Sequence, residues 1–141
     1  RREAAAEISL LKKPLINNDI AVPLEKISEF LTIMENKLPE LDPEADVLIV
    51  SHLGDGNVHY TVWPSLDDEK HKDKIMEAIE NVVLFLGGSF SAEHGIGISK
   101  LSSMERRKDS VALKVMRQIK DAIDPKGIMN PGKVLPREYD S

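Results

Sequence analysis

Cysteine is absent from this 141-residue chain, so disulfide bonds, thiolate metal sites and cysteine nucleophiles are excluded. This composition is compatible with a reducing compartment. No apolar run approaches the ~20 residues that a membrane-spanning helix needs, and no signal peptide is visible. Positive charge is also in deficit: the net charge is −5. That balance argues against nucleic acid or an anionic membrane surface as a partner, since both attract basic proteins.

The remaining composition is that of a soluble globular protein, with 41% hydrophobic and 30% charged residues. The length fits one domain with a core of its own. The chain begins at Arg1 in a helix-like run without an initiator Met, so we expect a fragment of a longer protein.

The hydrophobic pattern predicts helices alternating with a few strands. Apolar residues recur at three- and four-residue steps in the expected helices 24–38, 66–86 and 110–123. Residues 2–12 also favour a helix because they are rich in Ala, Glu and Leu, and Pro14 ends the run. Apolar or alternating runs predict strands over 19–22, 46–52, 57–63 and 89–92. We expect the last helix to bury Val115, Met116, Ile119 and Ile123, and the charged run around His71 to be solvent-exposed. The fold class is α+β, with helices packed on an antiparallel sheet.

The first informative motif is Ser-His-Leu-Gly-Asp-Gly-Asn-Val-His, between two strand-like runs. Asp55-Gly56 is typical of a two-residue type I′ hairpin turn, which needs positive φ at both central positions. That register pairs His52 with His59, with Cβ atoms about 4.5–5.5 Å apart on one face. Two imidazoles so placed can share a metal ion, although spacing alone supports an ordinary histidine pair equally well. The same face carries apolar side chains (Leu48, Val50 and Trp63), so we expect something to cover it.

The motif Ser-Ala-Glu-His-Gly-Ile-Gly holds the second candidate group. Glu93 and His94 are adjacent, so in an extended segment their side chains point apart and favour different roles. Glu93 would complete a His-His-carboxylate set that leaves a fourth position open. His94 would then act as a base near neutral pH. Gly95 and Gly97 would let a flat ligand or another backbone approach closely. The alternative is a glycine-rich cap before a helix over 99–108.

Three motifs together resemble one family: residues 52–59, residues 93–97 with Lys100, and Asp-Pro-Lys-Gly-Ile-Met-Asn-Pro-Gly-Lys at 124–133. The family is the C-terminal region of the FAD-linked D-2-hydroxyacid dehydrogenases, which include D-lactate dehydrogenase, the glycolate oxidase flavoprotein subunit and D-2-hydroxyglutarate dehydrogenase. The resemblance implies a flavoprotein of the vanillyl-alcohol-oxidase type, whose cap domain has a ferredoxin-like antiparallel sheet. Residues 1–141 would be the later part of that cap plus the C-terminal segment. The N-terminal FAD-binding domain would be absent from this chain.

The resemblance also implies roles for individual residues. His52, His59 and Glu93 would hold a divalent metal, expected to be zinc, which binds the oxygens of a D-2-hydroxy acid. His94 would take the hydroxyl proton while a hydride passes to FAD. The remaining assignments are Gly95, Gly97 and Asn130 to FAD and Arg2 to the substrate. We expect an electron acceptor of unspecified identity, self-association of the chain, and a location in the cytoplasm or, in a eukaryote, the mitochondrial matrix.

The substrate is the point at which this chain departs from part of the family. Members that accept the dicarboxylate 2-hydroxyglutarate carry Arg, Thr, Lys and Asn at four positions. The corresponding residues here are Arg2, Ala6, Asn17 and Thr61. Because only one cation remains, we expect a short or apolar monocarboxylate such as D-lactate.

Two other functions stay open. One is a stand-alone zinc hydrolase that uses His52, His59 and Glu93, with His94 polarising a water molecule. The other is a structural or interaction module without catalysis. An FAD-binding domain encoded upstream in the same gene would distinguish the flavoenzyme from both.

Overall fold

The computed structural model describes residues 14–52 and 54–136. Its elements in chain order are β1 (Ile16–Ala21), the 3-10 helix η1 (Leu24–Lys26), α2 (Ile27–Leu41), β2 (Asp46–His52), β3 (Asn57–Trp63), α3 (Glu69–Phe85), α4 (Leu101–Arg107) and α5 (Ser110–Ile123). The chain divides into two units, residues 1–94 and residues 95–141, and each is described by itself. Among the described helices, none combines the length and the apolar character that crossing a membrane requires.

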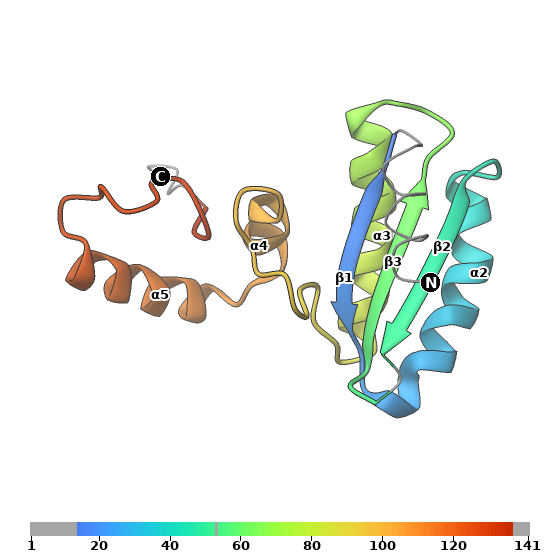
Figure 1. Ribbon diagram of the computed structural model, residues 1–141, viewed down its shortest axis with the longest axis horizontal. Helices are drawn as coiled ribbons and strands as arrows, with labels where there is room; N and C mark the ends of the chain where they lie inside the picture. Colours follow the sequence, from blue (N-terminus) through green and yellow to red (C-terminus); the bar gives the residue numbers. More distant parts are fainter. Residues whose placement is uncertain (1–13, 53, 137–141) are drawn as a thin grey trace. The chain divides into compact units, whose positions relative to one another are not determined.

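The first unit has an antiparallel three-stranded sheet in the order β1-β3-β2. β1 and β2 flank β3, and the connection between them passes through α2 (Figure 1). After α3 the chain returns to the outer edge of β1, where Ala21 and Ser89 form an isolated antiparallel bridge. This βαββα order, with a returning segment beside β1, is that of a ferredoxin-like fold. The predicted fold class is confirmed.

One face of the sheet packs against α2 and α3 and forms the core. The side chains alternate along each strand, so every second residue points to the helices. Phe30 of α2 and Tyr60 of β3 meet edge to face, with ring centroids 5.6 Å apart. The largest fully buried side chains of this layer are Phe30, Ile20, Met34, Ile75, Ile79, Val58, Val62 and Val83. The opposite face, which we call the open face, is free of these helices.

The strands β2 and β3 have the predicted bounds, but their register is different. His52 pairs with Asn57, and His59 pairs with Val50. The predicted pairing of His52 with His59 is therefore wrong by two residues. Because two is an even number, the shift leaves both histidines on the same face of the sheet.

The reason for the different register lies in the turn. The amide of Asp55 donates to the carbonyl of His52 (3.0 Å), and residues 53–56 connect the strands. Gly56 has a φ of 74°, whereas Asp55 has no positive φ. A type I′ turn needs positive φ at both positions, so the chain forms a longer loop.

The other predicted elements differ mainly at their ends. β1 begins at Ile16, three residues before the predicted strand, and α3 begins at Glu69. Residues 89–92 make one bridge in place of a strand. The predicted helix over 2–12 lies outside the described residues.

The second unit contains α4 and α5 followed by a turn-rich segment (Figure 1). α5 has the predicted bounds, but none of its residues is buried. Met116 is half-buried, and the rest of the expected buried set is exposed: Val115, Ile119 and Ile123. Together with Val111 they form an apolar stripe at four-residue spacing, so this prediction of burial was wrong. The amphipathic pattern is present, but the described residues of the second unit do not cover the apolar side of this helix.

Candidate metal centre

The candidate site lies on the open face of the first unit, where rows of side chains cross the three strands. The registers define three such rows. They are Asn17, Thr61 and Leu48; Asp19, His59 and Val50; and Ala21, Asn57 and His52. His52 and His59 are therefore diagonal neighbours, and their ring centroids lie 5.4 Å apart. Diagonal pairs remain within reach for aromatic side chains.

His52, His59 and Glu93 form the first ligand set. Each offers one ligand atom, and these atoms all lie within 4.8 Å of one another. Nε2 of His52 is 4.0 Å from a carboxylate oxygen of Glu93. The side-chain amide of Asn57 donates a hydrogen bond to that carboxylate (2.9 Å). Both histidines are half-buried and Glu93 is exposed. The sequence-predicted metal residues are thus brought together. Two imidazoles and a carboxylate are a donor set that zinc uses in catalytic sites.

Glu93 and His94 reach the site because their segment follows the outer edge of β1. Ala21 and Ser89 exchange backbone hydrogen bonds of 2.9 and 2.8 Å. Further along, the amides of Glu93 and His94 both donate to the Asp19 carboxylate. The ring of His94 lies 5.5 Å from the ring of His59. His94 is exposed and adjoins the ligand set, in a position suited to a proton acceptor.

Asp19 is a site residue that the sequence reasoning missed. With His59 and His94 it forms a second candidate ligand set, which shares His59 with the first. Its carboxylate oxygen Oδ1 is 3.8 Å from Nδ1 of His59, and its side chain is buried. A signal was present in the sequence, since three polar residues in succession, 17–19, are unusual within a buried strand.

The substrate residues inferred from the family fall partly on the open face. Asn17 and Thr61 are cross-strand partners, and the Thr61 hydroxyl donates to the Asn17 side-chain oxygen (2.7 Å). This neutral pair is in the row next to His59. Arg2 and Ala6 lie outside the described residues.

The open face is partly covered. Thr61 and Trp63 are 5% exposed, whereas Val50, opposite His59, is 39% exposed. The face is therefore buried toward the end of β3 and accessible beside the histidines, where a small molecule could enter.

The residues assigned to FAD belong to the second unit. Apart from the chain neighbours of each glycine, no heavy atom of the described residues lies within 4 Å of the position that a Cβ would occupy at Gly95 or Gly97. The carbonyl of Gly97 accepts a hydrogen bond from the amide of Val134 (2.9 Å), which ties this segment to the turn after α5. Asn130, in that turn, is exposed. The open backbone at both glycines fits the close approach of a planar ligand.

Asp124 organises the turn that carries Asn130. Its carboxylate accepts hydrogen bonds from the Lys120 ammonium (2.6 Å) and from the amides of Ile128 and Met129. The Lys120 hydrogen bond is the main reason that the pKa of Asp124 lies below its usual value. Asp124 is buried, and these charge-assisted hydrogen bonds give the Asp-Pro-Lys-Gly run a structural role.

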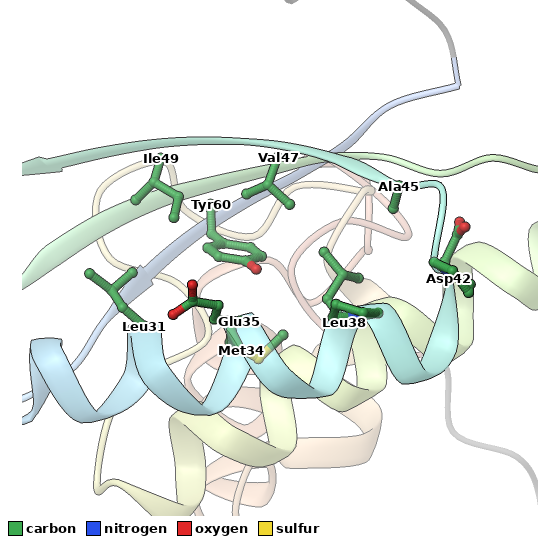
Figure 2. A pocket seen from close by; sticks show the side chains of 11 residues that line it. Leu31, Met34, Glu35, Leu38, Asp42, Ala45, Val47, Ile49 and Tyr60 are labelled. Atoms are coloured by element: carbon green, nitrogen blue, oxygen red, sulfur yellow. The ribbon is translucent and has the colours of Figure 1, made fainter.

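A pocket of about 340 Å³ lies on the other face of the sheet, between α2 and β2. Figure 2 shows Leu31, Met34 and Leu38 of α2 facing Val47 and Ile49 of β2. The Tyr60 ring lies between the two elements, and burial raises the pKa of its hydroxyl to about 12. Because the histidines point to the opposite face, this pocket is separate from the candidate metal centre.

His71 has a different environment from the one predicted. Its Nε2 lies 2.8 Å from a carboxylate oxygen of Asp42, and the His71 side chain is only 16% exposed. Burial alone would raise the pKa of Asp42, but hydrogen bonds from His71 and from the amides of Ser65 and Glu44 outweigh it and lower the pKa to about 2. The prediction of a solvent-exposed His71 was wrong. The helical charge pattern did not reveal the buried carboxylate 29 residues earlier.

Comparison with known proteins adds a family assignment to this geometry. Residues 1–134 match the sequence model of the family described as FAD linked oxidases, C-terminal domain. The chain is 34% identical to the mitochondrial D-2-hydroxyglutarate dehydrogenase of Arabidopsis thaliana over 139 residues, which cover 96% of the chain and 24% of the relative. It is 35% identical to the D-lactate dehydrogenase of Anaerostipes hadrus over 122 residues, which cover 82% and 25%. The chain spans about a quarter of the length of these curated relatives.

Proposed function

The chain belongs to the family of FAD-linked oxidases, C-terminal domain, and on that premise we propose that it is the metal- and substrate-binding part of a flavin-dependent D-2-hydroxyacid dehydrogenase. Relatives of similar identity are named for the oxidation of D-2-hydroxyglutarate and of D-lactate. The observation that carries the proposal is the convergence of His52, His59 and Glu93, whose ligand atoms lie within 4.8 Å of one another.

Each of the two implied groups fits the residues present. A divalent metal on His52, His59 and Glu93 would supply positive charge to the carboxylate and hydroxyl oxygens of a 2-hydroxy acid. FAD, approached by Gly95, Gly97 and Asn130, would supply the acceptor for a hydride from the substrate carbon. Zinc is our expected metal.

His94 provides the proton acceptor. Oxidation of a 2-hydroxy acid to a 2-oxo acid removes a proton from the hydroxyl oxygen and a hydride from the adjacent carbon. A ring nitrogen of His94 would take that proton, because the imidazole adjoins the ligand set and its backbone is fixed by Asp19. The hydrogen bond from Asn57 orients the Glu93 carboxylate toward His52. Glu93 would therefore serve as a metal ligand, whereas the adjacent His94 would serve as the base.

Metal titration of the 141-residue chain tests the assignment. We expect Glu93→Gln to lower zinc affinity by about 10-fold or more, since it weakens one of three ligands. His94→Ala should leave the affinity unchanged, as should the matched control His71→Ala, which removes a histidine outside the site. In the longer enzyme, His94→Ala should lower turnover by about 10²–10⁴-fold. An equal loss of metal in the Glu93 and His94 variants would contradict the role of His94 as a base.

For the substrate, we propose a short or apolar D-2-hydroxy acid, with D-lactate as the test compound. The described strand residues of the open face include no lysine or arginine. The Asn17 and Thr61 side chains are bonded to each other in the row beside His59. A second carboxylate would therefore lack a charged partner on these strands.

The remaining expectations concern the context of the whole protein. The exposed apolar stripe of α5 supports docking on a further part of a longer protein, or self-association when that part is missing. The mitochondrial matrix, as in the name of the Arabidopsis relative, stays a prediction for a eukaryotic source, and the cytoplasm for a bacterial one.

A further inference from the structure

Asp19 contacts the segment that carries Glu93 and His94, and it also lies beside His59. Its backbone carbonyl accepts a hydrogen bond from the amide of Ala92 (3.0 Å). Its side-chain oxygen Oδ2 accepts two more, from the amides of Glu93 (2.9 Å) and His94 (2.8 Å). One residue of β1 thus holds three consecutive amides of the segment that carries the third ligand and the base. Hydrogen bonds from amides to a buried carboxylate are stronger than those to a neutral acceptor.

The other carboxylate oxygen faces a metal ligand. Asp19 and His59 are cross-strand partners, and Oδ1 of Asp19 is 3.8 Å from Nδ1 of His59. This is ion-pair range, longer than a hydrogen bond. A carboxylate on that side of the ring favours the tautomer with a proton on Nδ1. Nε2, at the far end of the ring, then keeps its lone pair.

We propose that Asp19 is a positioning residue of the metal centre: Oδ2 fixes the backbone that presents Glu93 and His94, and Oδ1 holds His59 in the tautomer whose Nε2 can bind a metal. The inference rests on the proposed function in one respect, the choice of His59 as a ligand. Carboxylates that contact the second nitrogen of a ligating histidine orient the ring and increase its basicity.

The variant Asp19→Asn separates this role from simple structural support. Its amide oxygen can still accept from the amides of Glu93 and His94. Its NH2 group must then face Nδ1 of His59, where it is a donor in place of an acceptor. We expect the imidazole to change to the Nε2-protonated tautomer, which cannot bind a metal through Nε2. A similar Asp→Asn change beside a catalytic histidine leaves the geometry intact but selects the wrong tautomer.

The control is Asp42→Asn. Asp42 is likewise a buried aspartate that accepts hydrogen bonds from two backbone amides and lies close to a histidine nitrogen. It precedes β2, whereas His52 is at the far end of that strand. Both variants therefore remove a buried carboxylate from the same unit, but only one removes it from the site.

The experiment records ¹⁵N NMR spectra of the histidine rings in the metal-free 141-residue chain, at a pH at which imidazole is neutral, and then titrates zinc. We expect His59 to carry its proton on Nδ1 in the original chain and in Asp42→Asn, and on Nε2 in Asp19→Asn. Zinc affinity should fall by about 10–100-fold in Asp19→Asn and remain unchanged in Asp42→Asn.

Two results would overturn the inference. One is a proton on Nε2 of His59 in the original chain, which needs no variant and so holds even if Asp19→Asn fails to fold. The other is a folded Asp19→Asn chain with an unchanged His59 tautomer. Failure of the proposed function is recognised separately, because it appears as a lack of zinc binding in the original chain, whatever the tautomer.

Discussion

Four glycines of the first unit differ in two features, a positive φ and a close contact at the Cβ position. Alanine substitutions at these glycines therefore test how the hairpin that carries His52 is packed against β1. Gly56 has a positive φ of 74°, and a Cβ on it would overlap the backbone carbonyl oxygen of Val22. Gly87 has a positive φ of 77°, but a Cβ on it would meet no atom of the described residues within 4 Å apart from its chain neighbours. Gly88 has no positive φ, yet its Cβ would overlap the carbonyl oxygen of Ala21. Gly54 has no positive φ, and the described residues place no atom near its Cβ position.

The expected free energies follow from these two causes. Replacing Gly54 with alanine should change the free energy of unfolding by less than about 1 kcal/mol, with stabilisation from reduced chain entropy. Gly87→Ala should cost about 1–2 kcal/mol for the left-handed backbone alone. Gly88→Ala should cost about 1–3 kcal/mol for overpacking alone. Gly56→Ala combines both causes and should cost about 2–5 kcal/mol.

Urea unfolding of the four variants, followed by circular dichroism, measures these differences. The Gly56 result matters most for the site, since the Gly56 carbonyl accepts a hydrogen bond from the amide of Val22 (3.0 Å) and so docks the hairpin on the end of β1. The Gly56→Ala chain should also bind zinc more weakly than Gly88→Ala at equal folded fraction. If Gly56→Ala were as stable as Gly54→Ala, the close approach of the hairpin to β1 would be contradicted.

Three further predictions concern pH, association and substrate. The depressed pKa of Asp42 should contribute about 2 kcal/mol to the free energy of unfolding, which is present above pH 3.8 and lost as the pH falls through about 2. In Asp42→Asn, the free energy of unfolding should therefore depend less on pH in this acidic range. An unchanged pH dependence would refute the contribution. The chain should self-associate through α5 in sedimentation, and Ile119→Asp on the exposed stripe should reduce this; a strictly monomeric original chain at high concentration would refute it. The longer enzyme should have a higher kcat/KM for D-lactate than for D-2-hydroxyglutarate, by about tenfold or more for each lost charged contact of roughly 1.5–3 kcal/mol; a clear preference for the dicarboxylate would show that other cations reach the site.

The sequence was sufficient for the parts of the fold that depend on local pattern. The bounds of β2, β3 and α5 follow from apolar periodicity and turn residues, and both histidines were placed on the correct face. The register was not predictable from Asp55-Gly56 alone, because the type of turn depends on which residues adopt a positive φ.

The features that the sequence did not predict depend on contacts between segments that are distant in the chain. Asp19 is 74 and 75 residues away from the two backbone amides that donate hydrogen bonds to its carboxylate, and no local pattern links them. The His71–Asp42 pair was missed for the same reason. The stripe on α5 shows the opposite error: its periodicity was interpreted correctly as amphipathic, but periodicity does not say whether a partner is present.

The most direct test of the metal centre is to load the ¹⁵N-labelled chain with ¹¹³Cd²⁺ and to observe one-bond ¹¹³Cd–¹⁵N couplings, which appear only for directly coordinated histidine nitrogens. We predict couplings to His52 and His59 and none to His94, in agreement with the set that includes Glu93. Couplings to His59 and His94 without His52 would show that the ion prefers the set that contains Asp19, and would contradict the assignment of His94 as the base.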